Sequence, residues 1–106
     1  IITLDPLVLN HTITTNARYT IVNFSGPLNG SYAFGAITTT AQIGDVLVFM
    51  TTSDLLALSV DLLFNVTKYY LWCGTSVSVV DITGQERRLI HFTFDGTKWV
   101  STYNNC

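Results

Sequence analysis

Short apolar runs separated by clusters of turn-forming residues recur along the whole chain of 106 residues. The breaks are the segments SGPLNGS, AQIG, TTSD, CGT and TGQE, which are rich in Gly, Ser, Thr, Asn and Asp. Runs that return about every 8–12 residues between such breaks are typical of a β-sandwich or β-barrel. The pattern predicts nine strands, in residues 7–14, 18–24, 32–38, 45–52, 57–66, 69–72, 76–82, 87–94 and 98–103.

Alternation of apolar and polar residues predicts which side chains face the core. The clearest inward positions are Val60, Leu62, Phe64, Val66, Ile90, Phe92 and Phe94. His91 then points outward. Residues 46–50 are apolar at every position, which predicts a central strand covered by a second sheet on one side and by a neighbouring subunit on the other.

A helix over residues 53–64 is the main alternative to a strand there, because five leucines fit one helical face. They are Leu55, Leu56, Leu58, Leu62 and Leu63. Composition favours strands. Thr (16), Ser (7), Val and Ile are frequent, whereas the helix formers Glu (one) and Lys (two) are rare. We therefore expect one all-β domain over residues 1–106, an antiparallel, jelly-roll-like β-sandwich.

The charge pattern argues against nucleic acid and membranes as partners. The net charge is −2, and the five basic residues are scattered except for Arg87 and Arg88. The most apolar stretch, DVLVFMTTSDLLALSVDLLFNV, is interrupted by Asp45, Asp54 and Asp61. We expect no membrane insertion from such a stretch.

The sequence contains no recognisable catalytic pattern. It has two His and one Glu, and it lacks His-Glu-x-x-His, Cys-x-x-Cys, Gly-x-Ser-x-Gly and phosphate-binding glycine motifs. The six Asp lie beside turns or on outward strand positions. We therefore expect neither an enzyme nor a protein with a metal or another cofactor.

Asn-x-Ser/Thr sequons are the strongest local signal. Four occur, more than the Ser and Thr content would produce by chance, and none has Pro in the middle position. Glycans would also solubilise a chain with only 11% charged residues. The predicted N-glycosylation sites are Asn10, Asn23, Asn29 and Asn65. Asn29 ranks first because it lies in a Gly-Pro turn.

The two cysteines predict a disulfide. Cys73 follows a strand and Cys106 is the last residue, so a bond between them closes a loop of 34 residues (106 − 73 + 1). Loop entropy makes such a bond worth about 3–4 kcal/mol. The alternative is one buried thiol and one frayed thiol. The disulfide would imply an oxidising compartment.

The C-terminal segment contains Phe-Thr-Phe-Asp-Gly-Thr-Lys-Trp at residues 92–99. This stretch predicts a β-hairpin with a type I′ turn at Asp95-Gly96. Together with Gly44-Asp45 before an apolar strand, the residues Phe94, Asp95, Gly96 and Trp99 resemble the small β domains of phage and viral tail or surface fibres. The resemblance covers about residues 44–106. It implies a structural or attachment role and association into homotrimers or polymers. The sequons and the cysteine pair depart from bacteriophage proteins and point to a eukaryotic virus or a cell-surface filament.

Two functions follow. The first is a structural subunit of a self-assembling extracellular or virion-surface fibre, N-glycosylated and with an attachment role toward a host-surface glycan or receptor. The second is a monomeric carbohydrate-binding or adhesin module. In the second, aromatic residues stack on sugar rings, and the alternative for each of them is ordinary packing. Those residues are Tyr69, Tyr70, Trp99 and Tyr103.

The N-terminus is apolar but contains Pro6, which cannot donate a hydrogen bond within a sheet. Residues 1–6 therefore have two interpretations. One is an inter-subunit arm whose Ile1, Ile2 and Leu4 pack on an adjacent copy by strand addition. The other is an edge strand of the same domain.

Overall fold

The computed structural model describes residues 1–8, 12–15, 18–35, 37–64, 69–71 and 79–101, and none of these residues is helical. The described part of the chain is all-β. Its strands are β1 (Ile2–Leu4), β2 (Ile13–Thr15), β3 (Tyr19–Phe24), β4 (Tyr32–Ala33), β5 (Ile37–Thr39), β6 (Val46–Thr51), β7 (Asp61–Leu63), β8 (Tyr69–Leu71), β9 (Val79–Asp81), β10 (Arg88–Phe94) and β11 (Trp99–Ser101).

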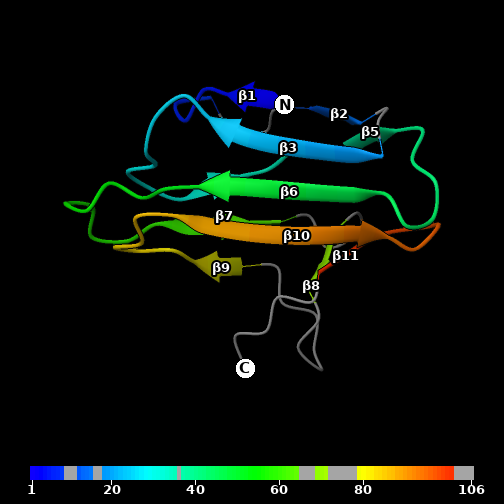
Figure 1. Ribbon diagram of the computed structural model, residues 1–106. Coiled ribbons are helices and arrows are strands. Elements are labelled where there is room, and N and C mark those ends of the chain that lie inside the picture. Colours follow the sequence, from blue (N-terminus) through cyan, green and yellow to red (C-terminus); the bar gives the residue numbers. More distant parts are fainter. Residues whose placement is uncertain (9–11, 16–17, 36, 65–68, 72–78, 102–106) are drawn as a thin grey trace.

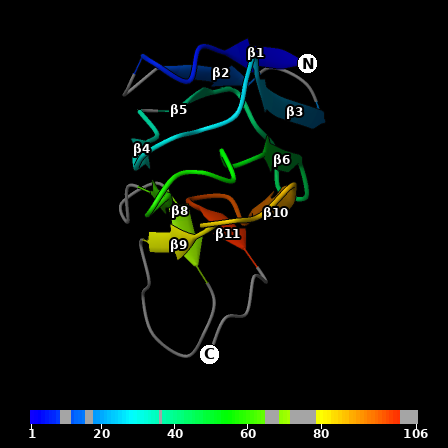
Figure 2. The same cartoon turned by 90° about the vertical axis from the view of Figure 1, so that its left-hand side faces the viewer.

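The strands form two layers. One is a six-stranded sheet in the order β1-β3-β6-β10-β11-β8, and β6 lies near its middle (Figure 1). The other layer holds the pair β2-β5 and the three strands β4-β7-β9. Figure 2 shows β4, β5 and β9 on the side opposite β6 and β10.

The chain crosses between the layers at almost every connection up to β10. Strand β2 lies between β1 and β3 in sequence but belongs to the second layer, and β4 and β5 separate β3 from β6 in the same way. Neighbouring parallel strands cannot be joined by a tight turn and need a crossover of this kind between them. Accordingly β1, β3 and β6 pair in parallel. The expected wholly antiparallel sandwich is therefore wrong in this respect, since β6-β10, β10-β11 and β7-β9 are antiparallel but five other described pairs are parallel.

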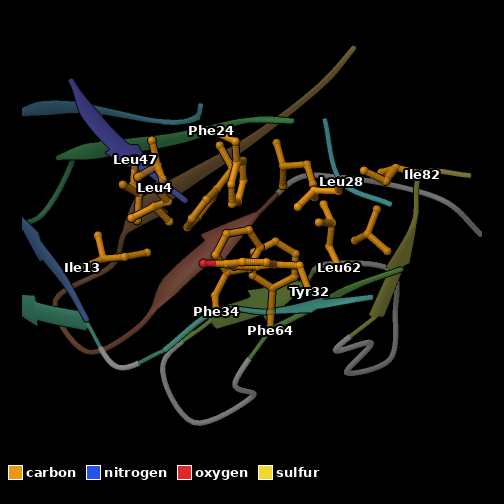
Figure 3. Packing of buried hydrophobic residues seen from close by; sticks show 14 of the residues in the cluster. Leu4, Ile13, Phe24, Leu28, Tyr32, Phe34, Leu47, Leu62, Phe64 and Ile82 are labelled. Carbon is orange, nitrogen blue, oxygen red and sulfur yellow. The ribbon is translucent and has the colours of Figure 1, made fainter. Parts of the chain in front are cut away.

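The core fills the space between the layers with aliphatic and aromatic side chains (Figure 3). Aromatic rings from both layers meet there. The ring of Phe34, which follows β4, lies 4.4 Å from that of Phe49 in β6, and the ring of Phe64, which follows β7, lies 5.2 Å from that of Phe92 in β10. These ring pairs join the two sheets directly.

The strand predictions are largely confirmed. Each of the nine predicted segments contains all or most of an observed strand, and residues 32–38 hold two, β4 and β5. The helical alternative for residues 53–64 is wrong, because this segment is a turn followed by β7. The inward positions of β7 and β10 are also confirmed, and His91 is exposed. Val66 lies outside the described residues.

The N-terminal segment is the edge strand of its own domain, the second of the two interpretations. Strand β1 pairs with β3, Leu4 is buried in the core, and Ile2 packs against that core. The inter-subunit arm does not apply to these two residues, because their apolar side chains are already buried within the domain. Of the three residues proposed for the arm, Ile1 is the one that is exposed.

Gly44 and Asp45 lie beside Phe94 at the C-terminal end of β10. These residues are the two parts of the sequence pattern that resembles fibre domains. The Gly44 N–H donates to the Phe94 carbonyl at 2.9 Å, and the Phe94 N–H donates to the Asp45 carbonyl at 2.9 Å. The following turn is centred on Gly96 and Thr97, because Asp95 lies opposite Lys98 and its N–H donates to the Lys98 carbonyl. The predicted type I′ turn centred on Asp95-Gly96 is thus wrong by one residue.

The Asp95 carboxylate fixes this turn by accepting the N–H groups of Thr97 and Lys98, at 2.8 and 2.7 Å. These hydrogen bonds, led by the one from Lys98, lower the pKa of Asp95. Gly96 has φ of +104°, a value that L side chains rarely adopt.

We expect Gly96→Val to destabilise the fold by about 1–3 kcal/mol, because a β-branched residue resists positive φ. An added Cβ would also lie 3.3 Å from Cγ1 of Ile43. Thermal unfolding measures the effect. Gly30→Val is the control, because Gly30 has ordinary φ and open space around it. An equal melting temperature for wild type and Gly96→Val would contradict the prediction.

One core residue carries a hydroxyl without a partner. The side chain of Tyr32 is fully buried among Phe24, Phe34 and other core residues, and its Oη has no hydrogen-bond partner among the described residues (Figure 3). Burial, and secondly the charge of Asp5, raises the pKa of the Tyr32 phenol above its usual value.

We expect Tyr32→Phe to raise the free energy of unfolding at neutral pH by about 1 kcal/mol, since it removes an unsatisfied buried polar group. Wild type should also lose stability as the pH rises above about 10, where the phenol ionises in the unfolded chain but not in the folded one. Tyr32→Phe lacks this contribution. Denaturant titrations test both effects, and Tyr19→Phe at an exposed position is the control. A less stable Tyr32→Phe would show that the hydroxyl is satisfied.

Candidate interaction surface

The side of the six-stranded sheet that faces away from the core is the candidate interaction surface. Side chains alternate along each strand, so the residues between the buried ones point outward. We call this surface the outer face and define it by nine residues of β3, β6 and β10: Tyr19, Ile21, Asn23, Val46, Val48, Met50, Leu89, His91 and Thr93. It faces the viewer in Figure 1, and β3, β6 and β10 lie along the right-hand side of Figure 2.

Val48 lies at the centre of the outer face. It is paired with Ile21 of β3 on one side and with His91 of β10 on the other. Its side chain is only 3% exposed although it does not belong to the core cluster. Val48 is therefore buried outside the core cluster, with Ile21 and His91 as its outward neighbours across the sheet.

The outer face carries no carboxylate, ammonium or guanidinium group. None of its nine positions is Asp, Glu, Lys or Arg. Tyr19 and His91 are exposed, and Leu89 is half-exposed. A face of this kind can contact an identical face without opposing like charges.

Only one strand of this surface can be predicted from the sequence pattern. The apolar run at residues 46–50 indicated β6 and its double covering, whereas Tyr19, Ile21 and Leu89 were not singled out. Their signal is the alternation with buried Thr20, Val22 and Ile90. It marks their outward direction but not their proximity to Val48, which depends on the order of the strands in the sheet.

Two of the four sequon asparagines belong to the described residues, and both are exposed. Asn23 lies on the outer face, opposite Thr3 of the edge strand β1. Asn29 lies in the loop between β3 and β4. Asn10 and Asn65 lie outside the described residues, as do Cys73 and Cys106.

The proposed sugar-stacking aromatics do not form one exposed platform. Trp99 is only 2% exposed, and its ring packs against Phe94 at 5.2 Å. Trp99 is therefore a core residue, and its assignment to sugar stacking is wrong. Tyr69 and Tyr70 belong to β8, next to β11, but only their backbone is described. Tyr103 lies outside the described residues.

The described part of the chain contains no candidate metal site and no candidate membrane-spanning helix. No three His, Cys, Asp or Glu side chains there gather as metal ligands would. Nor does any helix there have the length and apolarity needed to cross a membrane.

Comparisons with family models, with curated proteins and with solved structures find no match for this chain. Inferences about its function therefore rest on the residues and surfaces described above.

Proposed function

We propose that this chain is a structural β-domain that associates with copies of itself, as a homotrimer or a polymer, in an extracellular or virion-surface fibre. The observation that supports this best is the uncharged outer face with Val48 at its centre. Strands that run parallel, as β1, β3 and β6 do, are typically covered on both faces. Here one face is covered by the second layer, and a second copy is the occupant that we propose for the other.

The size of the face makes each contact weak. Strand β6 has six residues, so it is about 20 Å long at roughly 3.3 Å per residue, and three strands about 4.8 Å apart extend across about 15 Å. The outer face thus covers roughly 300 Å², less than half of the ~800 Å² per partner in a standard stable interface. Two outer faces that meet form a closed pair, so a homotrimer or a polymer needs a further contact surface besides this face. The pair contact itself depends on high local concentration.

The jelly-roll-like connection of the strands stays a prediction. Repeated crossing between the layers supports it, whereas the parallel pairs depart from the usual antiparallel form. The attachment role and the alternative of a monomeric carbohydrate-binding module also stay predictions. The alternative has lost Trp99 as a stacking residue.

We expect Leu89→Glu to abolish concentration-dependent association, because two copies of the face would then bury opposing carboxylates. Thr14→Glu is a matched control, since Thr14 is an exposed strand residue of the second layer. Light scattering after size exclusion, over a wide range of protein concentration, measures the mass. A wild-type protein that stays at 11.7 kDa at every concentration, or a Leu89→Glu variant that associates like wild type, would refute self-association through this face.

We propose that Asn23 and Asn29 carry N-glycans. In a eukaryotic secretory host, Asn29→Gln and Asn23→Gln should each lower the intact mass by one glycan, and Asn29 should be the more fully occupied site because it lies in an exposed loop. Asn16→Gln, outside any sequon, should leave the glycan mass unchanged. The bare polypeptide mass from such a host would refute the proposal.

A glycan on Asn23 would limit where a second copy can bind. Asn23 is next to the edge strand β1, so the glycan would project over the β1-β3 side of the outer face. The half formed by β6 and β10, with Val48 and Leu89, would remain available. Leu89→Glu therefore tests the half of the outer face that a glycan on Asn23 would leave open.

A further inference from the structure

Three exposed leucines lie together in the loop between β6 and β7. Leu55, Leu56 and Leu58 are 59%, 91% and 98% exposed. We call these three residues the leucine tip. In Figure 1 the green segment that contains them extends beyond the ends of β3 and β6. The tip therefore projects from one end of the molecule and is separate from the outer face.

The loop is held in place by contacts on both sides of the tip. The Ser53 N–H and Oγ–H both donate to the Gln85 carbonyl, at 3.0 and 3.1 Å. After the tip, the Val60 N–H donates to Thr83 Oγ1 at 2.9 Å. Ala57, between the leucines, packs against the core. The leucines are thus presented by a defined turn.

Three backbone N–H groups of this turn are satisfied within the chain. The Asp54 N–H donates to the Leu28 carbonyl at 2.6 Å, and the Ala57 N–H donates to the Asp54 carbonyl at 3.0 Å. The Asp54 carboxylate accepts the Leu56 N–H at 2.9 Å. A segment that enters hydrocarbon must meet this requirement, because lipid chains offer no hydrogen bonds.

The shape and charge of the tip also favour a lipid surface over a protein partner. The segment that carries the tip extends beyond the ends of β3 and β6, so a protein partner would need a recess to receive it, whereas a bilayer deforms around it. No residue from Leu55 to Val60 is charged. At the base of the loop, exposed Glu86 and Arg87 have opposite charges, so no electrostatic preference for anionic lipid is expected.

From these observations we propose that the leucine tip inserts reversibly into the interfacial region of a lipid bilayer. This differs from the expectation drawn from the sequence, where Asp54 and Asp61 interrupt the apolar stretch. In the structure Asp54 is engaged with the backbone of the turn, and Asp61 lies in β7 beyond the tip. The proposal does not depend on self-association through the outer face.

Binding should be weak and hydrophobic. Three leucines bury less apolar surface than a long acyl chain, so an association constant on the order of 10⁴ M⁻¹ or lower is expected, as for a single myristoyl group. Each leucine that is lost should weaken binding about tenfold.

The test is co-flotation of the full chain with phosphatidylcholine vesicles, with and without phosphatidylserine. We expect wild type to float with both kinds of vesicle and to be insensitive to salt. Leu55→Ser/Leu56→Ser/Leu58→Ser should remain in the soluble fraction. Ile1→Ser/Leu7→Ser, which removes two other exposed apolar side chains, should float like wild type. Thermal unfolding of each variant confirms that it is folded.

A second measurement reports the tip itself. In Leu56→Trp, fluorescence of the new indole should shift to shorter wavelength when vesicles are added, and the shift should be far smaller in Leu55→Ser/Leu56→Trp/Leu58→Ser. Wild type that stays soluble, a triple variant that still floats, or binding that needs phosphatidylserine and disappears in salt would each overturn the proposal. So would a triple variant that loses self-association without vesicles, because the tip would then contact another copy.

Discussion

Contacts between aromatic rings across the two layers hold the remainder of this structure in place. Phe34 and Phe64 come from the second layer and stack on each other at 4.8 Å, while Phe49 and Phe92 come from the six-stranded sheet. Each favourable ring pair contributes about 0.5–1.5 kcal/mol beyond the burial of its surface. The cluster also fixes register, because a shift of one residue in β6 would turn Phe49 from the core to the outer face. The Phe34 N–H donates to the Leu63 carbonyl at 3.0 Å, so the cluster is joined to the backbone pairing of the second layer as well.

Crossing between layers has a consequence for the surfaces of the molecule. Because β2 and the β4-β5 segment pass through the second layer, β1, β3 and β6 become parallel neighbours, and β6 lies in the interior of its sheet. Its inward residues Leu47 and Phe49 join the core, whereas outward Val48 is buried without belonging to the core cluster. The core therefore explains the inward-facing members of the five consecutive apolar residues 46–50. The apolar residues on its outer side are the physical basis for proposing a partner.

Local pattern allowed the strands to be predicted, because alternation and turn chemistry act over a few residues. It could not show what depends on distant parts of the chain. The sequence left residues 1–6 open between an edge strand and an inter-subunit arm, since only pairing with β3 and packing of Leu4 decide for strand β1. Trp99 looked available for ligand stacking, but its contact with Phe94 buries it. Leu55, Leu56 and Leu58 looked like strand or helix positions of a core. They are exposed because Ser53 is held by Gln85 and Asp54 caps the turn, and neither contact follows from spacing.

The leucine tip lies beyond the ends of the strands, whereas the outer face is the side of the sheet that those strands form. This arrangement connects the two proposals through symmetry. Two copies that meet face to face are related by a two-fold axis lying between the faces. If that axis runs along the strands, both leucine tips project from the same end of the pair, whereas an axis across the strands places them at opposite ends. Only the first arrangement lets both tips enter one bilayer. Each proposed contact is weak by itself, but a second tip would then bind at a high effective concentration, and the membrane would in turn concentrate the faces. The direction of the strands relative to the axis therefore decides whether membrane binding and assembly strengthen each other.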